Sequence, residues 1–147
     1  VVPTSPLPGS DVTLRIDIGS TQVTIAGLAS TNPGSTVAAD ERIARFSSLN
    51  AAATELIEPV LVAGNLETSR WSHAFEVIAN DMNNSEDGFG YSATWPSADW
   101  PMIGDYSGLP VDHAIYRGDI TVPARRVGPE LGPAHRPLVF ELSPAAG

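Results

Sequence analysis

One short segment near the middle of the chain is apolar at every position, and it constrains the fold more than any other feature. Residues 60–63 read Val-Leu-Val-Ala, and glycine follows directly. A strand with one solvent-exposed face alternates polar and apolar residues. A continuous apolar run of this length is therefore typical of a strand buried on both faces. Residues 60–63 therefore predict the centre of a sheet that other elements cover.

The segments before this run predict a hairpin followed by a helix. Residues 12–18 place apolar side chains at every second position, which indicates a half-buried strand, and a turn at 19–21 leads into a second strand. Apolar residues at helical spacing predict a helix over residues 37–58. Ser35 or Thr36 is expected to cap this helix, with Asp40 and Glu41 in its first turn.

The whole pattern predicts an α+β fold, with a mixed, largely antiparallel sheet of about six strands and two helices. The Pro-rich residues 1–10 predict an extended linker, and residues 11–147 a single domain. The second helix is expected to begin after Thr68 or Ser69 and to pack Trp71 and Phe75 on one side. The six predicted strands are residues 12–18, 22–28, 60–63, 111–116, 121–127 and 138–142.

The composition excludes some chemistries. The 147 residues include no cysteine, which excludes disulfides, thiolate catalysis and cysteine-bound zinc. The formal net charge is −9, and all eight basic residues are arginine. Nucleic-acid binders concentrate positive charge, whereas here only Arg125 and Arg126 are adjacent, so we expect no nucleic-acid partner.

Four short motifs occur in a fixed order along the chain. They are Gly-Asn-Leu-Glu at 64–67, Trp-Ser-His-Ala-Phe at 71–75, Val-Asp-His at 111–113 and His-Arg-Pro at 135–137. In this order they resemble motifs of the endonuclease/exonuclease/phosphatase family, which are metal-dependent phosphodiesterases related to DNase I. The resemblance covers about residues 12–142 and implies the second half of a family domain, that is, half of a DNase I-like four-layer sandwich.

Several positions depart from the family pattern that the resemblance implies. Asn65 and Glu67 stand where the family has an aspartate and an asparagine, so amide and carboxylate are exchanged. Ala29 stands in place of a histidine that contacts the scissile phosphate, and Ala134 in place of the aspartate before His135. Phosphodiester cleavage of this kind needs a metal, a base and donors to the developing charge. We therefore expect no catalytic residues and no cofactor in this chain.

A residual ligand site is one interpretation of the remaining polar residues. If the resemblance is right, Asn65, Glu67, Asp112 and His135 converge at one end of the sheet. Asp112 would then supply the carboxylate partner that His135 otherwise lacks. Glu67 is a weak candidate metal ligand, because a lone carboxylate beside an amide rarely holds magnesium tightly.

Each of these residues also has a purely structural interpretation. Asn65 and Glu67 can form a turn or cap a helix, and Asp112 can bond backbone at the start of a strand. His113 is expected to be a packing residue, and His73 to have a structural role on a helix surface. Three aromatic residues of the irregular segment 91–110 are either core residues or a surface for a sugar, a lipid headgroup or a protein. They are Trp95, Trp100 and Tyr106.

Two functions follow from the resemblance. The first is a catalytically degenerate phosphodiesterase-like domain that acts as a binding or interaction module of a bacterial envelope protein. We expect such a module to be extracytoplasmic, tethered to the membrane through segments outside this chain. Its partner would be the upstream half of the same protein or another protein, with a possible small ligand at the residual site. The alternative is a Mg-dependent phosphoester hydrolase that an upstream half completes, with Glu67 replacing the lost metal carboxylate.

Overall fold

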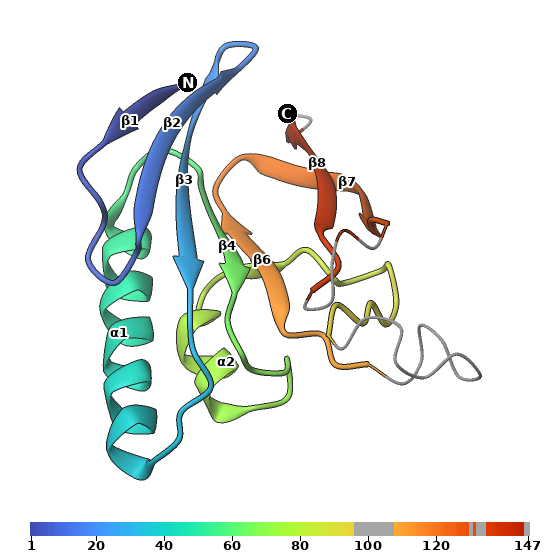
Figure 1. The fold of residues 1–147 in the computed structure, drawn as a ribbon. Coiled ribbons are helices and arrows are strands. Elements are labelled where there is room, and N and C mark those ends of the chain that lie inside the picture. Colours follow the sequence, from blue (N-terminus) through green and yellow to red (C-terminus); the bar gives the residue numbers. More distant parts are fainter. Residues whose placement is uncertain (96–107, 130, 132–134, 146–147) are drawn as a thin grey trace.

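The computed structural model describes residues 1–95, 108–129, 131 and 135–145 (Figure 1). These residues form eight strands and two helices. In chain order they are β1 (Val2–Thr4), β2 (Val12–Ile18), β3 (Thr21–Ala29), α1 (Thr36–Glu55), β4 (Val60–Asn65), α2 (His73–Ile78), β5 (Asn83–Asn84), β6 (Asp112–Arg117), β7 (Ile120–Val127) and β8 (Leu138–Pro144). Each of the six predicted strands is present, with ends within two residues of the prediction.

Six strands form one sheet in the order β1-β2-β3-β4-β6-β5. β3 and β4 run parallel, because α1 connects them, and the other neighbouring pairs are antiparallel. The apolar run at 60–63 forms the interior strand β4, buried as predicted. The predicted α+β class, with a mixed and largely antiparallel sheet and two helices, is confirmed.

The assignment of all six predicted strands to one sheet is wrong. β7 and β8 pair only with each other, and Figure 1 shows this hairpin set apart from the larger sheet. β1 and β5 complete the six-stranded sheet instead. β1 has three residues and β5 has two, and strands this short cannot be recognised from alternating polar and apolar residues.

The first ten residues, expected to be a linker, contribute to the folded unit. Val2–Thr4 pairs with residues 13–15 of β2, and Leu7 packs against the core. Pro3 is tolerated there because β1 lies at the edge of the sheet, where one side of the strand needs no ladder hydrogen bonds. The linker was predicted from proline content alone. Part of this segment instead forms an edge strand of the sheet.

Helix α1 begins where its cap was predicted but ends earlier. The Ser35 side chain accepts a hydrogen bond from the backbone N–H of Ala38 at 3.2 Å. Since the first helical residue is Thr36, the first turn contains no acidic residue, and the expected place of Asp40 and Glu41 there is corrected. The helix ends at Glu55, three residues before the predicted end. No helix in the described part of the chain is long and apolar enough to cross a membrane.

Helix α2 is shorter than predicted and begins later. Its cap is Ser72, whose hydroxyl accepts from the backbone N–H of Phe75 at 3.2 Å, rather than Thr68 or Ser69. Trp71 precedes the helix and is 67% exposed, so its expected packing on the helix is wrong. Thr68 instead shares a hydrogen bond with the Ser72 side chain.

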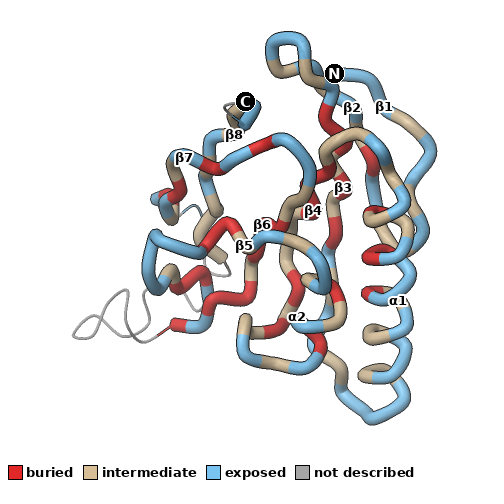
Figure 2. Tube along the Cα trace, turned by 180° about the vertical axis from the view of Figure 1, so that it is seen from behind, coloured by how far each residue is buried: buried red, intermediate tan, exposed pale blue. Residues whose placement is uncertain are grey.

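Both helices cover the same face of the larger sheet. The core on this face joins Phe46 of α1 and Ile78 of α2 to Ala26, Val62 and Ile115 of the strands. Figure 2 shows buried residues running along β3 and β4 and along the side of α1 that faces them. The opposite face of the sheet is the one on which the candidate site is built.

Candidate functional site

The end of β4 is fixed by a close approach between two backbones. A Cβ on Gly64 would lie 1.9 Å from the carbonyl oxygen of Leu28, and Gly64 has a φ of +148°. Only glycine fits such an approach. Beyond it, the strand register sets Asn65 beside Ala29 of β3 and Asp112 of β6. Three neighbouring strands therefore present these positions at one end of the sheet.

Asn65 and Glu67 form a turn that closes on itself. The Asn65 side-chain oxygen accepts from the backbone N–H of Glu67 at 2.9 Å, and its amide nitrogen donates to Glu67 Oε1 at 2.9 Å. Glu67 has a φ of 49°, in the left-handed region that non-glycine residues seldom adopt. The turn interpretation of this pair thus agrees with the geometry, whereas neither residue caps a helix.

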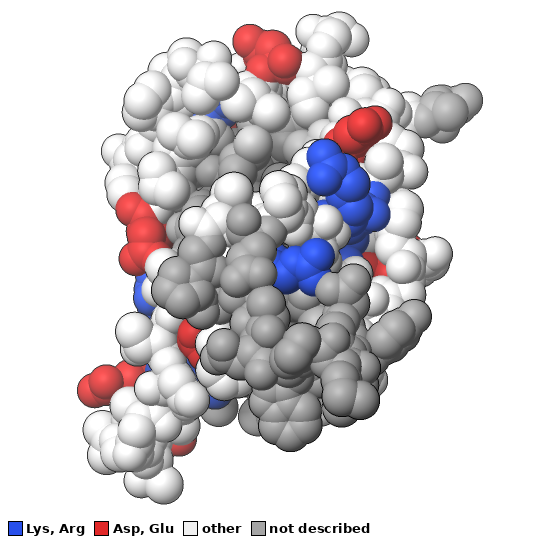
Figure 3. All heavy atoms as spheres, turned by 45° about the vertical axis from the view of Figure 1, so that its right-hand side comes forward, with Lys and Arg blue, Asp and Glu red and all other residues white. Residues whose placement is uncertain are grey.

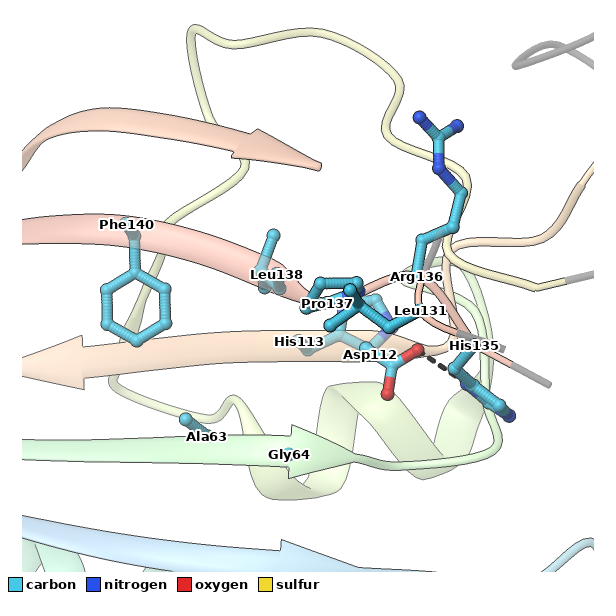
Figure 4. Close-up of a pocket in the computed structure, with 10 residues that line it drawn as sticks. All are labelled: Ala63, Gly64, Asp112, His113, Leu131, His135, Arg136, Pro137, Leu138 and Phe140. Atoms are coloured by element: carbon cyan, nitrogen blue, oxygen red, sulfur yellow. Dashed lines mark hydrogen bonds and ion pairs between the residues drawn. The ribbon is translucent and has the colours of Figure 1, made fainter. Parts of the chain in front are cut away.

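Asp112 and His135 form the second half of the site. His135 Nδ1 lies 2.8 Å from Asp112 Oδ2 (Figure 4). Its Nε2 lies 3.8 Å from Glu67 Oε1. The structure therefore brings Asn65, Glu67, Asp112 and His135 together from segments up to 70 residues apart. Donation from Nδ1 to a carboxylate fixes the histidine tautomer that leaves Nε2 as the proton acceptor. A role of these four residues in ligand binding stays a prediction.

Thr94 is a residue of this site that sequence reasoning missed. Its hydroxyl accepts from the backbone N–H groups of Val111 and Asp112, at 3.3 and 3.2 Å. Its carbonyl oxygen accepts from the backbone N–H of Arg136 at 3.0 Å. Thr94 thereby joins the segment before β6 to the segment before β8, and so sets Asp112 near His135. A lone threonine in an irregular segment carries no sequence signal for such a role.

Of the other two histidines, His113 packs in the interior as expected, whereas a structural role for His73 stays a prediction. His113 is buried, its Nε2 lies 2.8 Å from the carbonyl oxygen of Thr68, and its ring packs on Phe75 with centroids 4.6 Å apart. Burial lowers the pKa of His113, which favours the neutral ring. His73 is exposed at the start of α2, 3.5 Å from Glu76.

A cavity of about 380 Å³ opens beside this site (Figure 4). It lies between the end of β4, the start of β6 and the hairpin strand β8. Its lining consists of Ala63, Gly64, Asp112, His113, Leu131, His135, Arg136, Pro137, Leu138 and Phe140. Most of these side chains are apolar. The polar ones are Asp112, His113, His135 and Arg136, and they belong to the Val-Asp-His and His-Arg-Pro motifs.

The fit of these residues to a magnesium ion is limited by the hydrogen bonds that they already make. Within the described residues, no group of three or more His, Asp or Glu side chains is placed to hold a metal ion. Magnesium needs near-octahedral oxygen ligands, whereas His135 occupies one of the two Asp112 oxygens and the Asn65 oxygen accepts from the backbone N–H of Glu67. Trp95 is 44% exposed and bridges to Leu109. The expectations for Trp100, Tyr106 and Ala134 lie outside the described residues.

Comparisons with known proteins identify the fold. No protein-family model matches the chain, and no curated protein sequence matches it. Among solved structures, a conserved protein of unknown function from Enterococcus faecalis is 14% identical with a TM-score of 0.66, covering 90% of this chain and 54% of that one. An endonuclease/exonuclease/phosphatase from Bacteroides vulgatus is 13% identical with a TM-score of 0.63 over the same shares.

A third similar structure is the mannosyl-6-phosphatase of Bacteroides thetaiotaomicron, at 12% identity and a TM-score of 0.58. It is matched over 84% of this chain and 51% of its own. The chain thus spans about half the length of the solved structures that it matches. At these identities the likeness concerns the fold: the chain has the fold of about half of an endonuclease/exonuclease/phosphatase domain.

Proposed function

We propose that this chain is a phosphodiesterase-like domain that binds a ligand at Asn65, Glu67, Asp112 and His135 without hydrolysing phosphoesters by itself. The observation that carries the proposal is the closed turn of Asn65 and Glu67, whose side chains bond each other at 2.9 Å. A metal would have to compete with this bond for the Glu67 carboxylate. Ala29, which lies beside Asn65 in the sheet, offers no side-chain donor.

The test is an assay of the chain on bis-4-nitrophenyl phosphate and on DNA, with saturating Mg²⁺ or Mn²⁺. We expect no turnover above background, because a single donor to the developing charge contributes on the order of 10²–10³ in rate and Ala29 supplies none. Glu67→Ala is the control. Turnover in the unchanged chain that disappears in this variant would contradict the proposal.

A metal-dependent phosphoester hydrolase is the second candidate. The 2.8 Å contact between His135 Nδ1 and Asp112 Oδ2 favours it, since this arrangement suits a general base. The proposal requires magnesium and an upstream half that supplies further ligands, with Glu67 as the one carboxylate from this chain. Assaying the full-length gene product beside this chain distinguishes the two candidates. Activity restricted to the longer protein, and lost in its His135→Ala variant, would favour the hydrolase.

We also propose, on the family resemblance alone, that the domain faces outward from a bacterial envelope, tethered through other segments. Its partner would be the upstream half of the same protein or a second protein. Protease treatment of intact cells that express the full-length gene product tests the location. Protection of the domain until the cells are lysed would place it inside and contradict this proposal.

A further inference from the structure

The cavity beside the candidate site resembles a small-molecule pocket in its volume and in its lining. Its volume of about 380 Å³ falls in the range of ligand pockets, roughly 300–1,000 Å³. Ala63 of β4 and Leu138 and Phe140 of β8 supply apolar walls. Such pockets bury an apolar body and orient it with a few polar groups, so the polar end of the cavity decides the ligand class.

A carboxylate stands at the polar end of this cavity. Asp112 lines it, and in the described residues only Oδ2 of its carboxylate takes part in a hydrogen bond, to His135. The other oxygen makes no hydrogen bond within the described residues, and the Asp112 side chain is 17% exposed. Glu67 lies just beyond His135 and adds a second carboxylate.

Arg136, the basic residue of the lining, directs its charge elsewhere. Figure 4 shows its guanidinium pointing away from Asp112 and Phe140, and its Nε donates to the carbonyl oxygen of Gly128 at 3.4 Å. Figure 3 shows the arginine side chains gathered over the outer surface on this side of the molecule. Asp112 thus lines the cavity beside His135, while the guanidinium of Arg136 points away from it.

We propose that this cavity binds a small amphipathic cation: an ammonium or guanidinium group held by Asp112, on an aryl or short alkyl body that packs against Phe140 and Leu138. The inference rests on the proposed function, in which the site binds rather than cleaves. It departs from what a phosphoesterase fold suggests, because it assigns a positively charged ligand. Opposite charges at this depth attract, whereas an anion would meet a carboxylate at the same place.

The experiment compares three probes that share one body. We would titrate the chain with 4-phenylbutylamine, 4-phenylbutanol and 4-phenylbutanoate and follow binding by NMR chemical shifts at low salt. The amine is expected to bind on the order of tenfold more tightly than the carboxylate, with the alcohol between them. This ranking needs no variant, so it holds even where a substitution unfolds the chain.

Two variants separate the two ends of the cavity. Asp112→Asn should remove the preference for the amine, whereas Phe140→Ala should weaken all three probes alike. Val139→Ala is the matched control, because Val139 is the adjacent residue of β8 and does not line this cavity. Its probe affinities should equal those of the unchanged chain.

Several results would overturn the proposal. If 4-phenylbutanoate bound most tightly, the head group of the ligand would belong to Arg136 and His135. If no probe bound, the cavity would not be a ligand site. Amine affinity unchanged in Phe140→Ala would leave only a surface ion pair. The phosphoester assay reads hydrolysis independently of these titrations. Turnover in the phosphoester assay would contradict the proposed function. It would leave the order of the three probe affinities unaffected.

Discussion

The two faces of the six-stranded sheet differ in how completely they are packed. On the helix-covered face, Ala26 and Val62 are fully buried beneath Phe46 of α1. On the other face, Leu61 and Ala114 are also buried, but Leu14 and Ile25 of the paired strands β2 and β3 are only partly buried. That second face also carries Asp112 and the cavity, because residues opposite each other in a register share a face.

The contrast shows why alternation identified β2 but not its buried side. The sequence places Val12 and Leu14 on the apolar side of the strand, yet Val12 is 46% exposed and Thr13 is 2% exposed. The Thr13 hydroxyl accepts from the backbone N–H of Leu7 at 2.9 Å, so its burial leaves no unmet hydrogen bond. The closed face is the one that α1 and α2 cover, whereas the open face combines buried residues such as Leu61 with a cavity at one end of the sheet.

The largest expected effect is a truncation on the closed face. Phe46→Ala should destabilise the chain by about 3–5 kcal/mol, since it leaves a cavity in the core. Leu14→Ala, on the open face, is the matched change and should cost about 1 kcal/mol, because a half-buried side chain loses less transfer free energy. Chemical denaturation of both variants measures the difference. Equal losses would show that the open face is as tightly packed as the closed one.

A smaller loss of stability is expected at Gly64, where the backbones of β3 and β4 approach closely. Gly64→Ala should cost at least about 2 kcal/mol, because the added Cβ meets the Leu28 carbonyl and the backbone conformation is strained. The matched control is Gly34→Ala, since a Cβ there meets nothing within 4 Å. Thermal unfolding measures both variants. A Gly64→Ala variant as stable as the control would mean that β3 and β4 can separate without loss.

The buried His113 should make the closed face sensitive to pH. Because burial lowers its pKa in the folded chain, the unfolded chain binds a proton first as the pH falls. Stability should therefore be constant above about pH 6.5, the unperturbed value, and decline as the pH falls below it. Denaturant titrations between pH 7.5 and 5 measure this slope. His113→Phe should flatten it, and an unchanged slope in that variant would assign the effect to another group.

The smallest expected effect concerns the turn at the open face. Glu67→Gly relieves the left-handed backbone but removes the acceptor of the Asn65 amide, so the two contributions oppose each other. The free energy of unfolding should change by no more than about 1 kcal/mol. A loss above twice that amount would mean that the Glu67 carboxylate supports His135 as well as the turn.

The sequence predicted those parts of the fold and of the site that depend on near neighbours. The strand at 60–63, the cap at Ser35 and the turn of Asn65 with Glu67 each depend on residues within a few positions of one another. Motif order also indicated that Asp112 and His135 belong with this turn. Short-range patterns succeed because backbone propensity and local hydrogen bonds act over the same few residues.

The sequence by itself determined the α+β class, the central strand, the absence of cysteine chemistry and the set of four polar residues. Only the tertiary structure decided that β7 and β8 leave the main sheet, that β1 joins it, and that Thr94 sets Asp112 near His135. It also decided which face stays open. Pairing between distant strands and the burial of a face depend on contacts across the whole chain, and no local pattern specifies them.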